Sequence, residues 1–298
     1  MSELVKSITL PLAMITGSLL SGFFSNFSPV TPYLIFTMLF VTFCRIDLSQ
    51  MKPSPLHFWL LACQVFGSVA VYLVLRVFDE TLAQGVMICV MTPTATSSVV
   101  IAGMLGANIA TMATFSLLSN VTVALAAPVI FSLVGTNSEM PFMESFLIIL
   151  KKVVPLLVLP FVSAALLRRV ARKVYNTVGR YQIVSFYLWA FSLMVVCAQT
   201  VEFVKVQDSD NYMAEVWIAV GAMVACLCQF IGGRALGRKY GDTVAGGQSL
   251  GQKNTVLAIW MAQTYLNPIA SIGPASYVLW QNTVNSYQIW RKRKQGNN

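Results

Sequence analysis

The chain has 298 residues, of which 56% are hydrophobic and only 10% are charged, and its mean hydropathy is +0.69. Soluble domains carry about 25% charged residues, so this composition excludes an ordinary soluble fold and predicts a polytopic membrane protein. The net charge of +9 is spread over the polar segments between apolar runs, so nucleic acid is not an expected partner. All six cysteines fall within apolar segments and the single histidine is His57, so neither a disulfide framework nor a zinc site is expected.

The apolar runs, taken in chain order, predict an all-α polytopic membrane protein with ten transmembrane helices. The first run begins close to the N-terminus and shows no small-residue cleavage site, so we interpret it as a span and not as a signal peptide. The ten spans are expected at about 5–25, 30–44, 55–77, 81–105, 108–134, 145–170, 178–201, 212–236, 241–265 and 269–290.

The basic residues indicate how these spans are oriented. When the N-terminus is placed in the cytoplasm, most Lys and Arg residues fall in cytoplasmic loops and most Asp and Glu residues in outside loops, as the positive-inside rule requires. We therefore expect an integral protein of the bacterial inner membrane with both termini cytoplasmic. The clusters Arg168–Lys173 and Arg291–Lys294 are interpreted as anchors to lipid headgroups. Lys253 is the one basic residue that this arrangement assigns to neither side of the membrane.

Two of the ten spans are interrupted by residues that break or weaken helices. The fourth holds Thr92, Pro93 and further small polar residues at its centre, where proline removes a backbone donor. The ninth holds three glycines, followed by Lys253 and Asn254 and an apolar stretch too short to span alone. The alternative is a simple proline kink and a cytoplasmic loop. A loop would leave the rest of the ninth span too short to cross and would disturb the charge pattern.

Both interruptions fall in the fourth span of a five-span half. Paired interruptions in corresponding positions are typical of secondary transporters built from inverted repeats, whose binding site lies near the bilayer midplane. We therefore expect repeats at about 1–136 and about 137–292 within a single membrane transporter domain, 1–298. Unwound backbone at that depth is tolerated only where protein or a wet cavity satisfies its polar groups.

Three stretches resemble motifs of the bile acid:sodium symporter family. "TPTATSSVV" (Thr92–Val100) is similar to the family's crossover in the fourth helix, and "SLGQKNTVLA" (Ser249–Ala258) is similar to its ninth-helix motif. "LWQNTVNS" (Leu279–Ser286) is similar to a motif of its tenth helix, and the resemblance covers about residues 5–292.

The resemblance implies a fold and an activity. The implied fold has ten helices in a panel domain, about 5–44 and 145–201, and a core domain, about 55–134 and 212–290. Helices four and nine would be broken and would cross at their unwound centres in the core domain. The implied activity is the transport of organic anions together with sodium.

The chain departs from the family at the positions that the resemblance assigns to sodium. One site would fall on Ser98, Val99, Met112, Ser116 and Ser249, where the family's Asn, one hydroxyl and the carboxylate are replaced. The other would use Gln64, Ser249 and Lys253, with lysine in place of a glutamine. Hard cations need several oxygen ligands, and an ammonium about 4 Å away would repel Na⁺ by several kcal/mol. We therefore expect no cofactor and no intact metal site, and bound sodium is possible but not favoured.

Lys253 is instead expected to act as a built-in cation that fills the role of the missing ion at the crossover. Half-helices that begin near Thr96 and Asn254 would direct their positive ends into the same cavity, which favours an anion. Substrate contacts suited to a carboxylate and hydroxyls are expected from Thr96, Ser97, Lys253, Asn254, Gln281 and Asn282. The alternative for Lys253 is a structural tether that snorkels to the inner surface, and Gln64, Gln281 and Asn282 could equally form inter-helix hydrogen bonds.

The sequence thus predicts a secondary transporter that moves a small organic anion by alternating access, independently of sodium. Coupling could be to protons through Lys253, or it could be absent. The runner-up is a conventional sodium-coupled symporter of bile-acid-like organic anions, and a ligand-binding membrane sensor is the alternative from another class. An enzyme is not expected, because the usual nucleophile and metalloprotease motifs are missing. The organic anion and the lipid bilayer are the expected partners.

Overall fold

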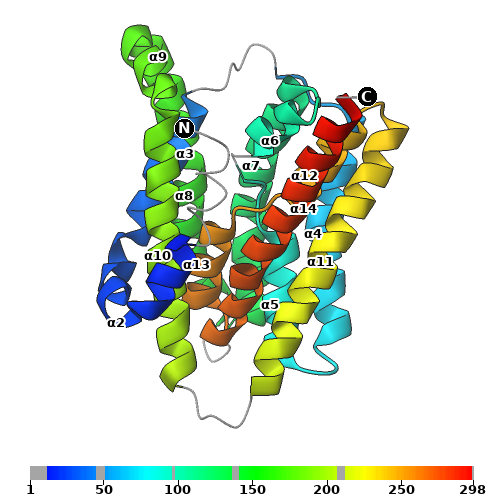
Figure 1. Cartoon of the computed structure of the whole chain (residues 1–298). Coiled ribbons are helices and arrows are strands. Elements are labelled where there is room, and N and C mark those ends of the chain that lie inside the picture. The colour runs from blue at the N-terminus through cyan, green and yellow to red at the C-terminus, as the bar shows by residue number, and fades with distance from the viewer. Residues whose placement is uncertain (1–11, 45–50, 96–97, 136–140, 207–211, 297–298) are drawn as a thin grey trace. The chain divides into compact units, whose positions relative to one another are not determined.

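The structure is a computed structural model of the chain and describes residues 12–44, 51–95, 98–135, 141–206 and 212–296 (Figure 1). These residues are helical almost throughout and contain no strand, apart from one isolated antiparallel bridge between Thr94 and Lys253. The helices in chain order are α2 (Ser21–Phe24), η1 (Ser25–Val30), α3 (Thr31–Phe43), α4 (Pro55–Leu75), α5 (Glu80–Met91), α6 (Ser98–Met104), α7 (Ile109–Val134), α8 (Phe142–Val170), α9 (Arg172–Arg180), α10 (Gln182–Val206), α11 (Tyr212–Lys239), α12 (Thr243–Gly251), α13 (Thr255–Tyr265), η4 (Pro268–Ser271) and α14 (Ile272–Gly296).

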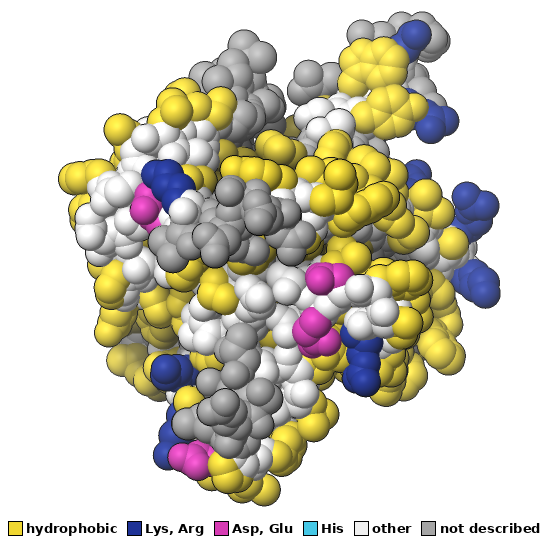
Figure 2. Space-filling model, turned by 90° about the horizontal axis from the view of Figure 1, so that it is seen from below, with side chains coloured by type: hydrophobic (Ala, Val, Ile, Leu, Met, Phe, Trp, Pro, Cys, Tyr) yellow, Lys and Arg dark blue, Asp and Glu magenta, His cyan; other side chains and the backbone are white. Residues whose placement is uncertain are grey.

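Five helical stretches of the described chain are long and apolar enough to cross a membrane. They are Ser21–Phe43, α4, α7, α8 and α11. Large apolar side chains on these stretches are exposed; Phe66 on α4 and Leu125 on α7 are 73% and 62% exposed. Figure 2 shows hydrophobic side chains over much of the face that it draws, together with several Lys, Arg, Asp and Glu side chains. These features point to an integral membrane protein, because exposing so much apolar surface to water is energetically unfavourable.

Side chains and prolines set where several helices begin. Ser54 forms a capping box with His57 at the start of α4, and Pro55 occupies the first turn, where its missing N–H costs nothing. Asp79 accepts a hydrogen bond from the N–H of Leu82 at 2.6 Å and so caps α5. Asp242 caps α12 in the same way through the N–H of Ala245 at 2.8 Å.

The chain folds into two compact units. Unit 1 comprises the described residues of 1–47, 124–212 and 259–271, and unit 2 those of 48–123, 213–258 and 272–298. The chain passes from one unit to the other within α7, after Val123, and within α13, after Ala258. The segments expected for a panel domain, 5–44 and 145–201, lie in unit 1. The expected core segments lie in unit 2 except for 124–134, Tyr212 and 259–271. The first and last of these exceptions arise because α7 and α13 are continuous helices that extend from one unit into the other.

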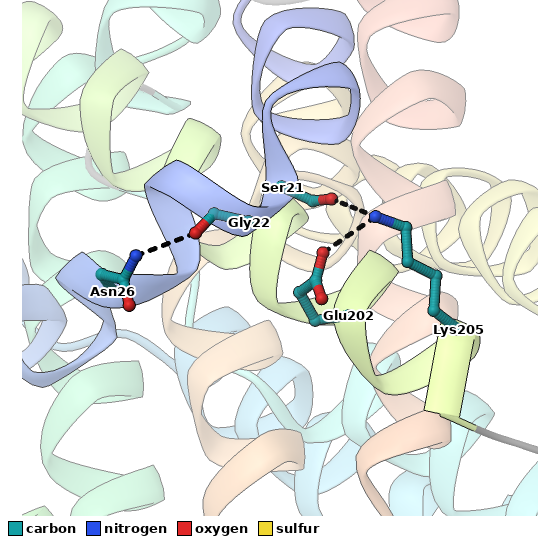
Figure 3. Close-up of polar contacts among 5 residues, drawn as sticks. All are labelled: Ser21, Gly22, Asn26, Glu202 and Lys205. Carbon is teal, nitrogen blue, oxygen red and sulfur yellow. Dashed lines mark hydrogen bonds and ion pairs between the residues drawn. The ribbon is translucent and has the colours of Figure 1, made fainter.

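In unit 1, α3 packs against α8 and α10, while α2 and η1 pack against α10. Lys205 near the end of α10 donates hydrogen bonds to the hydroxyl of Ser21 at 2.6 Å and to the carboxylate of Glu202 at 2.9 Å (Figure 3). The side chain of Asn26 donates to the carbonyl of Gly22 at 2.8 Å. Lys205 is exposed and already paired with a carboxylate, so this cluster ties α2 to α10 and is not a reactive Ser–Lys pair.

The structure corrects several details of the sequence prediction. Residues 26–29, expected to connect two spans, are helical in η1, where Pro29 adopts the helical φ that its ring favours. Residues 172–177, expected to be a loop, belong to the amphipathic helix α9. Cys63 and Cys228 lie in apolar helices but are exposed, and all six cysteines are free.

Candidate functional site

Two helix interruptions meet in unit 2. Helix α5 ends at Met91 and α6 begins at Ser98, while α12 ends at Gly251 and α13 begins at Thr255. The extended residues between them pair as a short antiparallel bridge: the N–H of Ala95 donates to the carbonyl of Gln252, and the N–H of Asn254 donates to the carbonyl of Pro93, both at 2.9 Å. Each interruption therefore satisfies backbone groups that the other leaves without a helical partner.

Lys253 lies in the second interruption, and its side chain is 1% exposed. Its Nζ donates hydrogen bonds to the carbonyls of Val90, at 2.7 Å, and Thr92, at 3.1 Å. These carbonyls belong to the last turn of α5, where the backbone acceptors have no partner within the helix and the helix dipole is negative. The amino group of Lys253 thus caps the C-terminal end of α5 from a segment far away in the sequence.

Gln64 on α4 binds the same carbonyl end of α5. Its Nε2 donates to the carbonyls of Met91, at 2.7 Å, and Thr92, at 2.9 Å. Its Oε1 accepts from the hydroxyl of Ser119 at 2.8 Å, and this hydroxyl accepts from the N–H of Thr94 at 3.2 Å. Side-chain donors from α4 and from the second interruption therefore satisfy the carbonyls of Val90, Met91 and Thr92.

Helix α14 holds the backbone of Lys253 in place. Gln281 accepts from the N–H of Lys253 at 2.9 Å and donates to its carbonyl at 3.4 Å. A ladder of amides continues along the helices from this point. Gln248 donates to Asn285 at 3.1 Å and to Gln288 at 3.2 Å, and Asn285 donates to Gln252.

The other predicted substrate-binding residues have varied positions. Asn254 is buried, and its side chain accepts from the N–H of Leu257 at 3.3 Å, which caps α13. Asn282 is partly buried on α14 and makes no hydrogen bond to Lys253 or Gln281 within the described part of the chain. Thr96 and Ser97 lie outside the described residues.

The remaining residues at the predicted ion positions are apolar or hydroxyl-bearing. Ser249 donates to the sulfur of Met112 at 3.4 Å, and Val99 packs beside Met112. The hydroxyls of Ser98 and Ser116 are buried without a hydrogen-bond partner among the described residues. No group of three or more His, Cys, Asp and Glu residues that could hold a metal ion occurs in that same part of the chain.

Several residues of this site were not predicted from the sequence. Ser119, Gln248, Gln252, Asn285 and Gln288 all bind other polar groups in unit 2. A signal was present for α14, because Gln281, Asn285 and Gln288 recur at helical spacing and so lie on one face. On an apolar helix such a polar face indicates contact with another helix rather than with lipid.

Known proteins add no assignment. No protein-family model matches the chain. No curated protein matches it either. The resemblance to the bile acid:sodium symporter family therefore rests on the quoted motifs and stays an expectation.

The chemistry of the site follows from its donors. The amine of Lys253, the amides of Gln64 and Gln281 and the N–H of Asn254 before α13 all donate to backbone carbonyls in this buried region. Such groups attract anions and carbonyl dipoles and disfavour a second cation. Among the described residues, the amine of Lys253 and the amide of Gln64 donate to the backbone carbonyls at the end of α5.

Proposed function

We propose that the chain is a secondary transporter that moves a small organic anion across the membrane by alternating access. One observation supports this most strongly: a fully buried lysine joins two helix interruptions from opposite halves of the sequence. A buried ionisable side chain at a pair of interruptions is the arrangement by which secondary transporters bind their substrates and ions.

The proposal includes the topology. Helices α5 and α6 would be the halves of a fourth span, and α12 and α13 the halves of a ninth, in two inverted repeats at about 1–136 and 137–292. The five apolar stretches, with α10, α14 and the segment before Ser21, would complete ten spans. Both termini would lie in the cytoplasm of a bacterium, because the basic residues concentrate in the loops on that side.

Lys253 takes the role of a bound cation in this proposal. A sodium ion at the end of α5 would be coordinated by backbone carbonyls, and Lys253 already occupies two of them. Transport would then proceed without sodium, and the amino group would hold the crossing segments together in place of the ion. Substrate would bind beside Lys253 and Asn254, where the N-terminal end of α13 adds positive potential.

A sodium-coupled symporter is the second candidate. The buried hydroxyls of Ser98 and Ser116, which have no hydrogen-bond partner among the described residues, favour it because they are oxygen ligands of the kind that sodium uses. A membrane sensor that binds the same anion without exchanging it is the third candidate.

Counterflow in proteoliposomes tests the proposal. Vesicles preloaded with individual carboxylates and sulfonates would be assayed for exchange of the labelled compound in sodium and in choline buffer. We expect at least one anion to exchange equally well in both buffers, and exchange to be lost in Lys253→Gln but kept in Lys205→Gln. Exchange that requires sodium would favour the symporter, and saturable binding without exchange would favour the sensor.

A further inference from the structure

Helix α9 is an amphipathic helix whose surface is basic on one side. It follows the break at Ala171, where α8 ends with Arg168 and Arg169. Lys173 and Arg180 lie on one side of α9, whereas Tyr175 lies on the other. Between Glu144 and Glu202 the sequence contains no acidic residue at all. The positive charge of this region is therefore not balanced by neighbouring carboxylates of the sequence.

One side of α9 is fixed to unit 1. Tyr175 is buried, its hydroxyl donates to the carbonyl of Phe43 at 3.3 Å, and the guanidinium of Arg168 lies 6.0 Å from its ring centroid. These contacts hold the helix at the end of α8 (Figure 1). They leave Val174 uncovered, on the strip of the helix between Tyr175 and the basic side.

The exposed apolar residues continue from α8 into α9. Leu166 and Val170 at the end of α8 are 60% and 78% exposed, and Val174 is 51% exposed. Because α8 is long and apolar enough to cross a membrane, the exposed residues at its end lie where hydrocarbon gives way to headgroups. An apolar strip bordered by Lys and Arg at that depth is the pattern of helices that lie in the membrane interface.

We propose that α9 binds the surface of an anionic lipid leaflet, with Val174 inserted among the headgroups and Lys173 and Arg180 bound to their phosphates. The positive charge of α9 favours anionic lipid as its partner, because cytoplasmic leaflets carry a negative surface potential that attracts clustered Lys and Arg. The proposal concerns unit 1 alone and does not depend on the transport function.

A fluorescent reporter in full-length protein tests this. In a background with Cys63→Ser and Cys228→Ser, an environment-sensitive dye is attached through Val174→Cys or, on the basic side, through Asn176→Cys. The protein is placed in nanodiscs of phosphatidylcholine with increasing phosphatidylglycerol and a quencher carried on the lipid tails. We expect quenching at position 174 to grow with phosphatidylglycerol, and the dye at position 176 to stay in water.

Charge variants separate lipid binding from simple apolar contact. Lys173→Gln with Arg180→Gln should weaken the lipid-bound state about thirtyfold, because each basic residue near such a surface contributes on the order of 1 kcal/mol. Lys151→Gln with Lys152→Gln removes the same charge from the first half of α8, away from α9, and should change nothing. Equal quenching at 174 and 176, quenching independent of phosphatidylglycerol, or a response to a soluble polyanion and not to lipid would each overturn the proposal.

Discussion

Lys253 is buried, and its amine donates hydrogen bonds to two backbone carbonyls. A buried lysine without a carboxylate partner is destabilising unless hydrogen bonds offset the loss of water. Its bonds to Val90 and Thr92 supply that compensation at the negative end of α5. Removal of the lysine would take this donor from the carbonyl of Val90, whereas the carbonyl of Thr92 would keep its bond from Gln64.

The substitution Lys253→Met separates these two effects. Methionine has a similar volume but cannot donate a hydrogen bond. If the bonds of the lysine did not stabilise the fold, this substitution would raise the free energy of unfolding. If the amine braces the interruptions, loss of its two bonds should lower the free energy of unfolding by about 2 kcal/mol. Thermal unfolding in detergent would then show a melting temperature lower by about 5 °C. Lys205→Met, at an exposed ion pair, is the control and should stay within about 1 kcal/mol of the wild type.

Gln64 should matter as much as the lysine. Gln64→Leu removes donors to Met91 and Thr92 and the acceptor for Ser119, and leaves buried polar groups unpaired. We expect a loss of about 2–3 kcal/mol in chemical or thermal unfolding. Cys63→Ser, at the exposed neighbouring position, should be close to neutral. Equal effects of the two substitutions would mean that the amide network contributes little.

At the scale of elements, α11 and α12 approach each other through their backbones. A Cβ atom on Gly246 would lie 2.2 Å from the carbonyl oxygen of Gly233, and one on Gly237 would lie 2.3 Å from that of Asp242. Small residues allow this approach, which places α12 directly against α11. The turn between the helices uses Gly241 at a φ of 81°, a conformation that favours glycine.

Gly246→Ala tests this close contact. The added methyl cannot fit without moving a backbone, so we expect a loss of 1–3 kcal/mol, as is typical of overpacked sites. Gly232→Ala on α11 is the matched control, because no heavy atom lies within 4 Å of its Cβ position. It should be neutral or slightly stabilising. Melting curves that do not distinguish the two variants would contradict the packing described for α11 and α12.

Sequence patterns recover the long elements better than the connections between them. The expected spans at 55–77, 108–134, 145–170 and 212–236 coincide closely with α4, α7, α8 and α11, because long apolar runs have few alternatives. Helix α9 was not predicted, because its basic residues are equally compatible with a loop, a lipid anchor or an amphipathic helix. Lys253 was singled out because the other basic residues could be assigned to one side of the membrane. Its acceptors on α5 could not be predicted, because backbone carbonyls leave no trace in a sequence.

At the scale of the whole molecule, the charges of the helix ends predict orientation. Helix α11 begins near Glu215 and ends with Arg238 and Lys239, so the positive-inside rule places its end in the cytoplasm. Helix α4 should run the opposite way relative to α5, with the turn after Leu75 outside.

Cysteine labelling in intact cells measures this orientation. In the background without Cys63 and Cys228, Phe78→Cys should react with an impermeant maleimide from outside. Arg238→Cys should react only after the membrane is opened. The reverse pattern would show that the topology is the opposite one. Labelling of Phe78→Cys and Arg238→Cys alike from outside would contradict the membrane assignment of α11.

The dependence of the melting temperature on the cation in solution tests the central claim most directly. The melting temperature of purified wild type and of Lys253→Gln would be compared in NaCl, KCl and choline chloride at equal ionic strength, since an ion that binds only the folded state raises it. The account predicts that wild type melts at one temperature in all three salts, and that Lys253→Gln melts lower and is raised by sodium alone. Specific stabilisation of wild type by sodium would show that the ion binds beside Lys253 and would contradict the proposal that the lysine has taken its place.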